Sequence, residues 1–478
     1  MTWPSLRTGT WAAILVGLVL VGAGGLIATE HPFGSPIGSV YLAHAGLTPK
    51  VIATDLPERQ GGAGSLITAD LDGDRRRDFI ITGSGYIAAY AATGAPLWRR
   101  DAAIHLTETA EKEGLPGLHA PGVQAADIDG DGEPEVLFLT NAGTLQILEG
   151  RSGTGQEPIR LPPPPADAER WEHLVVANFR GPGVRDLLLQ ATNARGYRMG
   201  RYLAAYSIEE LLRAGAAATA LWRRDDFLAL AHSGARIADL DGDGRHEVLG
   251  GDVIGPAGER LVRLPVEGHL DALLVADVRP DLPGLEVVAL EERGPERVFL
   301  YNREGLIWAT HHQHQEPQNA AVGDFDPARP GLEIWCRSRY NQHQRPWLLD
   351  AHGKLIAEYE MTEVAPEGWT ARGVETINAI AWQGSPRQLA VAKERHKSGE
   401  VAIFDPLTGA FLLRLDEQAD RLYVADVTGD WREEIVVLNG GELRIYENLA
   451  DNPDPARPSL WSQDHYRSSK LTWNYYNP

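Results

Sequence analysis

The chain has 478 residues, of which 43% are hydrophobic and 23% are charged, so it can build a large folded core. It carries 66 acidic and 45 basic residues, for a net charge of −21. This balance argues against nucleic acid as a partner, because neutralising phosphates requires a surplus of Lys and Arg. Cationic ligands, including metal ions, suit the sign better. Cys336 is the only cysteine, which excludes an intramolecular disulfide framework and a thiolate zinc cluster.

An uncharged apolar run of 18 residues, 11–28, lies near the N-terminus. Its length is just enough to span a bilayer, and Arg7 ahead of it favours an orientation with the N-terminus inside. The run fits either a cleaved signal peptide or a retained signal-anchor helix. Both interpretations assign residues 1–29 to this segment, place the rest of the chain outside the cytoplasm, and confine any membrane contact to the N-terminus.

The remainder of the chain contains an internal repeat, in which a hydrophobic pair, an acidic loop and a leucine-rich or β-branched strand follow one another. Seven clear copies begin at Ile67, Val123, Leu174, Ala235, Leu273, Ala320 and Leu422, and a copy that has lost its carboxylates begins at Ile377. The leading polar positions lie about 51 residues apart on average. Late in most copies, two alternating strands flank a glycine turn, as in FLYNREGLIWAT from Phe299.

Four short strands in each of eight repeats predict an all-β fold, an eight-bladed β-propeller of four-stranded blades. Tandem sandwich domains are the alternative, but they need about 100 residues each and would not give one acidic loop per repeat. We assign residues 30–50 to a linker and outer strand and residues 51–478 to a monomeric propeller. Ser207 and Glu210 form a capping box that predicts a short helix over 208–213. We expect the residues after Asn448 to close the ring against the N-terminal segment.

The acidic loops are the strongest chemical signal in the sequence. Three copies follow the pattern D-x-D-G-D with a further acid at the start of the next strand. These copies comprise Asp70, Asp72, Asp74 and Asp78; Asp127, Asp129, Asp131 and Glu135; and Asp239, Asp241, Asp243 and Glu247. Several oxygen ligands in a flexible loop suit Ca²⁺ better than Mg²⁺, which keeps more water. The alternative is a solvated Asp-Gly turn without an ion.

The other copies of the loop are less complete. Asp426, Asp430 and Glu434 keep three acids, and we include them among the predicted calcium ligands. The copies that begin with Asp277 and Asp324 carry proline-containing insertions. In the copy at Asn178 we expect Arg180 to replace the ion beside Asp186. We expect the ions to be structural, because binding only the folded state stabilises it.

The acidic loops resemble the FG-GAP/VCBS repeats of integrin-like propellers. Residues 268–292 (GHLDALLVADVRPDLPGLEVVALEE), 322–336 and 425–447 resemble the propeller of rhamnogalacturonan lyases of polysaccharide lyase family 11. This resemblance implies a calcium-loaded propeller that cleaves pectic rhamnogalacturonan by β-elimination, with His269 and Asp271 as the matched positions nearest to the chemistry. Where the family usually shows a second histidine, this chain has Leu274.

A polar and aromatic stretch offers candidate substrate-binding residues in an otherwise acidic chain. These are Trp335, Arg337, Arg339, Tyr340, His343 and Arg345. Aromatic faces stack on sugars, and arginine pairs with carboxylates through two hydrogen bonds. The alternative for this stretch is a solvated loop joined to ordinary strand residues.

Two functional classes therefore remain open. The first is a protein that binds or cleaves acidic polysaccharide outside the cytoplasm, with Ca²⁺ as its cofactor. The second is a non-catalytic propeller of the FG-GAP type that binds a cell-surface or protein partner.

Overall fold

The structure is a computed structural model that describes residues 47–54, 56, 66–104, 122–193, 199–231, 234–312, 316–338, 344–367, 369, 374–394 and 399–471. All of them belong to one compact unit, Ile37–Pro478. The apolar run at 11–28 lies outside the described residues. Within them, no helix has the length and apolar character needed to cross a membrane.

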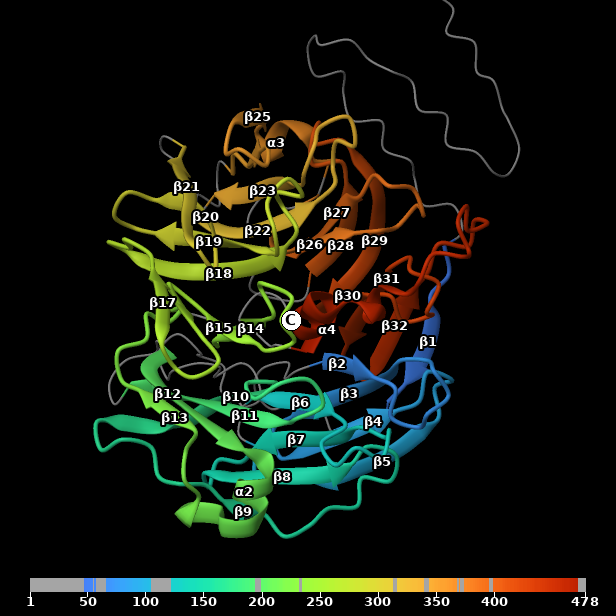
Figure 1. Ribbon diagram of the computed structural model, residues 1–478. Coiled ribbons are helices and arrows are strands. Elements are labelled where there is room, and N and C mark those ends of the chain that lie inside the picture. Colours follow the sequence, from blue (N-terminus) through green and yellow to red (C-terminus); the bar gives the residue numbers. More distant parts are fainter. Residues whose placement is uncertain are drawn as a thin grey trace, which may run out of the picture. The chain divides into compact units, whose positions relative to one another are not determined.

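Thirty-two strands form eight four-stranded antiparallel sheets, the blades of a β-propeller, arranged around a ring (Figure 1). Blade 1 contains β2 (Leu66–Ala69), β3 (Asp78–Gly83), β4 (Tyr86–Tyr90) and β5 (Pro96–Asp101). Blade 2 contains β6 (Val123–Ala126), β7 (Glu135–Leu139), β8 (Thr144–Glu149) and β9 (Ile159–Arg160). Blade 3 contains β10 (Ala168–Ala177), β11 (Asp186–Asn193), β12 (Met199–Ser207) and β13 (Trp222–Arg224). Blade 4 contains β14 (Arg236–Ala238), β15 (Glu247–Leu249), β16 (Asp252–Ile254) and β17 (Arg260–Arg263).

The second half of the ring repeats this plan. Blade 5 contains β18 (His269–Ala276), β19 (Glu286–Glu292), β20 (Arg297–Asn302) and β21 (Gly305–His311). Blade 6 contains β22 (Pro317–Gly323), β23 (Glu333–Ser338), β24 (Trp347–Leu349) and β25 (Leu355–Glu358). Blade 7 contains β26 (Val374–Ile380), β27 (Leu389–Glu394), β28 (Gly399–Phe404) and β29 (Phe411–Ala419). Blade 8 contains β30 (Arg421–Ala425), β31 (Glu434–Asn439), β32 (Glu442–Tyr446) and β1 (Lys50–Ala53). The predicted eight-bladed, four-stranded propeller is therefore confirmed.

Closure of the ring differs from the prediction. The strand β1 pairs antiparallel with β32, with Lys50 opposite Ile445, so a strand from the start of the described chain completes blade 8. The residues after Asn448 do not close it. They lead instead into the 3₁₀ helix η2 (Leu460–Ser462) and the helix α4 (Asp464–Leu471). The edge strand β32 is thus already covered by β1, which removes the exposed edge that motivated the prediction.

The helix α4 lies inside the ring (Figure 1). It contacts β2, β6, β14 and β18, which are the first strands of four blades. Polar groups anchor it there: Lys470 Nζ is 3.2 Å from Glu433 Oε1, and Gln124 Nε2 donates to Leu471 O at 2.7 Å. A cavity of about 440 Å³ remains beside α4, between the helix and the strands of blades 4 to 8.

Three shorter helical segments lie in connections between strands: α2 (Ile208–Ala214), the 3₁₀ helix η1 (Gly215–Ala217) and α3 (Met361–Val364). The predicted capping box forms, because Ser207 Oγ accepts a hydrogen bond from Glu210 N at 3.4 Å. This bond satisfies one of the free N–H groups of the first turn of α2. The sequence expectation of a short helix after Ser207 is confirmed.

The hydrophobic core is divided among neighbouring blades. For example, Ile80 and Ile87 of blade 1 pack with Val136 and Phe138 of blade 2 in one buried cluster. Burying each such side chain contributes about 1.5–3 kcal/mol. Because both faces of a blade are covered by its neighbours, residues of both parities along a second strand are buried, as all five residues of β7 show.

Main-chain hydrogen bonds join six of the connections between first and second strands to the next blade. We call the connection between the first and second strands of blade n loop n. In six blades the residue just before the second strand donates its N–H to a carbonyl of the preceding loop. These bonds are Arg77 to Val427, His246 to Asn178, Leu285 to Leu240, Leu332 to Val278, Gln388 to Asp324 and Glu433 to Ala381. Loops 1 and 2 contact the next blade through side chains instead: Leu71 packs with Val136 in one buried cluster, and Arg185 Nε donates to Asp127 O at 3.0 Å. The acidic loops therefore lie at the joints between blades.

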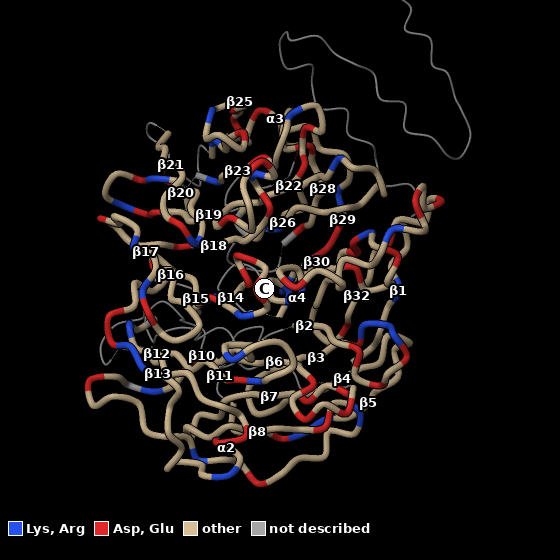
Figure 2. The backbone as a smooth tube through the Cα atoms, in the orientation of Figure 1, with Lys and Arg blue, Asp and Glu red and all other residues tan. Residues whose placement is uncertain are grey.

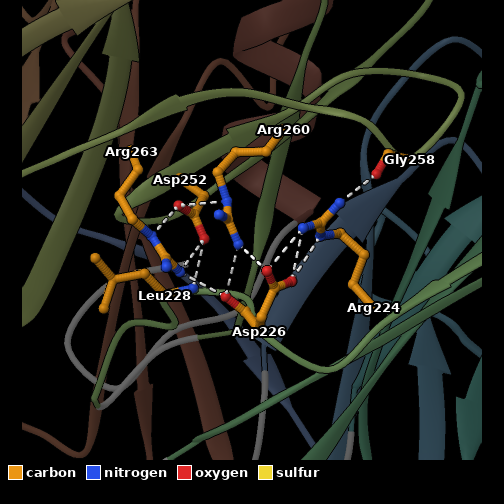
Figure 3. A network of polar contacts seen from close by, with 7 residues as sticks. All are labelled: Arg224, Asp226, Leu228, Asp252, Gly258, Arg260 and Arg263. Carbon is orange, nitrogen blue, oxygen red and sulfur yellow. Dashed lines mark hydrogen bonds and ion pairs between the residues drawn. The ribbon is translucent and has the colours of Figure 1, made fainter.

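A network of arginines and aspartates adds a further joint between blades 3 and 4 (Figure 3). Arg224 of β13 binds Asp226 with two nitrogens and donates to the Gly258 carbonyl at 2.7 Å. Arg260 bonds to Asp226, and Arg263 Nε donates to Asp252 Oδ1 at 2.8 Å. All three guanidinium groups have carboxylate partners, so this cluster stabilises the joint between the two blades.

Candidate functional site

The carboxylates of loops 1, 2 and 4 form three compact groups, each drawn from the leading acid, the second acid and the acid that begins the following strand. We call this last residue the closing acid. The groups are Asp70, Asp72 and Asp78; Asp127, Asp129 and Glu135; and Asp239, Asp241 and Glu247, with one oxygen of each residue within 4.8 Å of the others. The third acids, Asp74, Asp131 and Asp243, instead accept the N–H two residues later and stabilise their own turns.

Each closing acid uses one oxygen to hold its loop. In loop 2, Glu135 Oε2 accepts Ile128 N at 2.9 Å, and in loop 1 Asp78 Oδ2 accepts Leu71 N at 2.7 Å. Burial, helped by the neighbouring loop carboxylates, raises the pKa of Glu135 to about 7 and that of Asp78 to about 6. Within the described part of the chain, the buried Glu135 Oε1 has no hydrogen-bond partner. A cation would satisfy it, so the residues of loop 2 fit Ca²⁺.

Loop 8 does not match its sequence expectation as well. Asp426 Oδ2 accepts Leu460 N at 3.1 Å, Asp430 Oδ2 pairs with Arg432, and Glu434 Oε1 accepts the Thr428 hydroxyl at 3.0 Å. Each of the three carboxylates thus has protein donors, and the three are not among the compact groups formed by the described residues. The predicted calcium ligands Asp426, Asp430 and Glu434 are therefore not brought together.

Loop 3 behaves as the sequence suggested. Arg180 Nε donates to Asp186 Oδ1 at 2.9 Å, and Arg180 Nη2 lies 2.8 Å from the same oxygen. In loops 5 and 6 the buried oxygens Glu286 Oε1 and Glu333 Oε1 have no hydrogen-bond partner among the described residues. These two loops lack the D-x-D-G-D pattern, so their spacing in the sequence predicts calcium binding less strongly than that of loop 4.

A second cluster lies at the opposite end of blade 5 from its acidic loop. His269 begins β18 and pairs in register with Glu292 at the end of β19. His269 Nε2 is 3.1 Å from Glu292 Oε2 and 3.2 Å from Asp271 Oδ1. The three residues each offer a ligand atom within 4.8 Å of the others. One nitrogen and two carboxylate oxygens form a set that can bind a divalent cation or orient an imidazole.

Local backbone features position this cluster. The register between β18 and β19 shifts at Asp271, which is the extra residue of a β-bulge, a feature that re-aims side chains. Gly268 lies against the following turn so closely that a Cβ would be 2.1 Å from Glu292 O, so only glycine fits. Burial raises the pKa of Asp271 well above its ordinary value, and the hydrogen bond from His269 opposes that rise.

The cluster is accessible through the histidine. The His269 side chain is 16% exposed, whereas Asp271 is fully buried and Glu292 is 7% exposed. The exposed Arg293 follows in a turn with a φ of +65°, and its Nε is 3.9 Å from Glu292 Oε1. Neither His269 nor Asp271 lines the cavity beside α4.

Glu292 was missed by sequence reasoning. Glu292 could have been found from strand pairing, because in an antiparallel pair the first residue of one strand lies opposite the last residue of the next, and the acidic loop marks where the two strands are joined. Counting outward from Ala276 and Glu286, which pair next to loop 5, reaches His269 and Glu292 once the bulge is allowed for.

The polar and aromatic stretch requires a correction. Trp335 and Arg337 are both fully buried. Trp335 Nε1 donates to Tyr359 Oη at 2.7 Å, and Arg337 Nε donates to Val374 O at 3.1 Å. Both side chains lie between blades 6 and 7, so they are not available to a ligand from solvent. Their polarity suggested a surface, but β23 is covered on both faces.

Of the remaining candidates in that stretch, only Arg345 lies among the described residues. Arg339, Tyr340 and His343 lie outside the described residues. Arg345 is exposed, and its guanidinium is 3.1 Å from Glu358 Oε1 and 3.3 Å from Glu360 Oε1. Lys and Arg are interspersed with Asp and Glu around the ring in Figure 2.

Comparison with known proteins identifies the family. Residues 191–477 match the family described as Rhamnogalacturonan lyase family 11, C-terminal domain, which is more than half of the chain. The chain belongs to rhamnogalacturonan lyase family 11. Residues 70–138, which carry loops 1 and 2, match the FG-GAP-like repeat.

Family 11 relatives align over most of this chain. The Rhamnogalacturonan endolyase YesW of Bacillus subtilis (strain 168) is 24% identical over 500 residues, covering 87% of this chain and 73% of the relative. The Rhamnogalacturonan exolyase YesX of the same organism is 23% identical, covering 80% and 71%. The crystal structure of YesX shares the fold, with a TM-score of 0.68 and 19% identity over 90% of this chain and 81% of that chain. A rhamnogalacturonan lyase of Bacillus licheniformis also shares it, with a TM-score of 0.65 and 20% identity over 90% and 81%.

Proposed function

We propose that this family 11 protein cleaves rhamnogalacturonan, or a closely related acidic polysaccharide, by β-elimination, and that it does so outside the cytoplasm. The observation that carries the proposal is the His269–Asp271–Glu292 cluster, which lies in the segment that matches the lyase family. The similarity to both an endolyase and an exolyase supports the substrate class and leaves the mode of cleavage open. The apolar run at 11–28 supports an extracytoplasmic location.

The chemistry explains why such a cluster is useful. β-Elimination removes the proton on the carbon beside a uronate carboxylate, forms a carbon–carbon double bond and expels the glycosidic oxygen. The site must therefore neutralise that carboxylate, accept the proton and let the leaving oxygen gain one. A divalent cation held by His269, Asp271 and Glu292 would neutralise the carboxylate. Arg293 adds a second positive group next to Glu292, on a side chain that is 62% exposed. A guanidinium there can pair with the substrate carboxylate through two hydrogen bonds.

The test uses the folded protein from residue 30 onward, which keeps all described residues. It is incubated with rhamnogalacturonan, and the ultraviolet absorbance of the unsaturated uronate product is followed in calcium and in chelator. We expect a rise in calcium that His269→Ala reduces at least ~100-fold, in line with losing a group that acts in the transition state. His352→Ala is the matched control, because His352 is exposed in a turn of blade 6.

The opposite result is equally informative. A flat trace with folded protein, on rhamnogalacturonan and on other uronans, would contradict the lyase proposal. It would favour the second class, a binding propeller, and glycan arrays would then identify its ligand. Equal activity of His269→Ala and wild type would show that the cluster is not the reacting centre.

We also propose that loops 1 and 2 hold Ca²⁺ as joints between blades. The compact carboxylate groups and the buried Glu135 Oε1 support this role. An ion at each joint stabilises the folded state by mass action and compensates for the absence of disulfides in a chain with one cysteine. Isothermal titration of chelator-treated protein with Ca²⁺ tests it, and Glu135→Gln should remove one bound ion.

A further inference from the structure

Loop 4 differs from loop 2 although its sequence pattern is as complete. Its closing acid, Glu247, uses Oε2 to accept Leu240 N at 3.0 Å, as Glu135 does in loop 2. Its second oxygen, Glu247 Oε1, has a donor: Arg303 Nε lies at 3.2 Å. The same nitrogen is 3.1 Å from Asp241 Oδ2. One guanidinium therefore contacts two of the three carboxylates that would bind an ion in loop 4.

Arg303 belongs to the next blade and is held in place. It lies in the turn between β20 and β21, where Asn302 Oδ1 accepts Glu304 N at 2.9 Å and Gly305 N at 3.2 Å. These bonds fix the turn from which the side chain extends. The Arg303 side chain is only 29% exposed, so it is partly withdrawn from solvent beside the loop.

Blade 5 packs tightly against loop 4 at the same place. Leu285 N donates to Leu240 O at 2.9 Å, and a Cβ on Gly284 would be 2.1 Å from the same oxygen. The backbone of blade 5 thus sets the distance between Arg303 and the carboxylates of loop 4. A side chain on a fixed turn and a fixed joint loses little further freedom on pairing, which favours the ion pair.

The loops satisfy the second oxygen of the closing acid in different ways. The closing acid always has one oxygen engaged by its own loop, and the second oxygen needs a positive or donor group. Arg180 of loop 3 supplies that group to Asp186 from the loop itself. Arg303 supplies it to Glu247 from the neighbouring blade. In loop 1 the neutral Ala92 N donates to Asp78 Oδ1 at 2.8 Å, so a main-chain group rather than a charged side chain satisfies this oxygen. In the described part of loop 2, Glu135 Oε1 has no such group.

We propose that Arg303 is a tethered cation that fills loop 4, so that loop 4 does not take Ca²⁺ while Arg303 is present. A divalent ion in this loop would lie against a guanidinium, and like charges that close repel each other. The joint between blades 4 and 5 is consequently independent of calcium, unlike the joints at loops 1 and 2. This inference rests on the proposal that loops 1 and 2 bind Ca²⁺.

The experiment counts bound ions by isothermal titration and equilibrium dialysis with Ca²⁺, using the full propeller from residue 30. Arg303→Met keeps the bulk of the side chain and removes its charge, and it should bind one more Ca²⁺ per chain than wild type. Arg245→Met is the matched control. It also removes one positive charge beside loop 4, but Arg245 contacts Asp243 rather than Asp241 or Glu247. It should bind the wild-type number.

A second variant locates the additional ion. Asp241→Asn placed in the Arg303→Met protein should return the count to the wild-type number. Equal counts in wild type and folded Arg303→Met, with both binding Ca²⁺, would overturn the role of Arg303 while leaving calcium in loops 1 and 2 intact. No binding to either protein would overturn the calcium proposal itself and this inference with it.

Discussion

Replacing Lys470 with methionine tests whether α4 is held in the ring by a buried ion pair. Lys470 Nζ is 3.2 Å from Glu433 Oε1, and the two side chains are 11% and 4% exposed. Removing one partner of a buried pair costs about 3–5 kcal/mol, because a charge remains buried without its counterion. Glu433 keeps two other donors, Ala381 N and the Tyr466 hydroxyl, each at 2.9 Å. We therefore expect the lower end, about 3 kcal/mol.

The expected change in melting temperature follows from size. With an unfolding entropy of about 2.1 cal/mol/K per residue, the roughly 370 described residues give about 0.8 kcal/mol/K. Lys470→Met should therefore lower the melting temperature by about 4 °C. Differential scanning calorimetry at two scan rates measures it, with Lys354→Met, at an exposed turn, as the control that should not change.

The double variant Lys470→Met with Glu433→Gln separates the effect of the lysine charge from that of the packing of its stem. A neutral amide no longer needs a counterion, so the double variant should recover most of the loss and lie within about 1 °C of wild type. A double variant as unstable as Lys470→Met alone would show that packing of the lysine stem, rather than its charge, anchors α4. An unchanged melting temperature for Lys470→Met would refute the anchoring role altogether.

Three further predictions concern the metal loops, a buried histidine and the corrected arginine. Chelator should lower the melting temperature, because each ion present at a thousand times its dissociation constant contributes about 4 kcal/mol, and an unchanged melt would contradict calcium binding. Burial lowers the pKa of His173 from 6.5 to about 4, and the ring hydrogen-bonds Ala235 O at 3.1 Å. As the pH falls, the unfolded state therefore takes up a proton before the folded state does. The contribution of His173 to stability is complete above pH 6.5 and falls by up to about 3 kcal/mol as the pH drops to about 4. His173→Gln should flatten this pH dependence of stability, measured by urea titrations at several pH values. Arg337→Met should lower the melting temperature, since the buried Val374 O loses a donor, without changing the affinity for polysaccharide, whereas Arg345→Ala should leave the melting temperature unchanged within about 1 °C.

The fold was predictable because its signals are local and repeated. Alternation, glycine turns and the spacing of the acidic loops each act within one blade, and eight repeats of the pattern reinforce one another. The loops at Asp127 and Asp239 could likewise be recognised from spacing alone. The difference between them could not, because Arg303 lies 56 residues beyond Glu247 and reaches it only after blade 5 docks.

The incorrect expectations share a physical cause. Trp335 and Arg337 looked like surface residues because they are polar or aromatic and lie near other such residues. A second strand in a propeller is covered on both faces, so its side chains are buried whatever their character, and Arg337 satisfies its donors internally. The position of α4 depends on contacts with four distant blades, which no local pattern encodes.

The pairing of β1 with β32 has a consequence for how the chain acquires its structure. Lys50 and Ile445 face each other across almost the whole sequence, so the contact carries one of the largest loop-closure entropies the chain can have. During synthesis β1 leaves the ribosome first but waits for its partner until blade 8 has been made. Blades 1 to 7 can assemble with their neighbours in order, and closure becomes the last and slowest step. Until then β32 presents an unpaired edge, so the yield of folded protein depends on how fast the four residues of β1 pair with it.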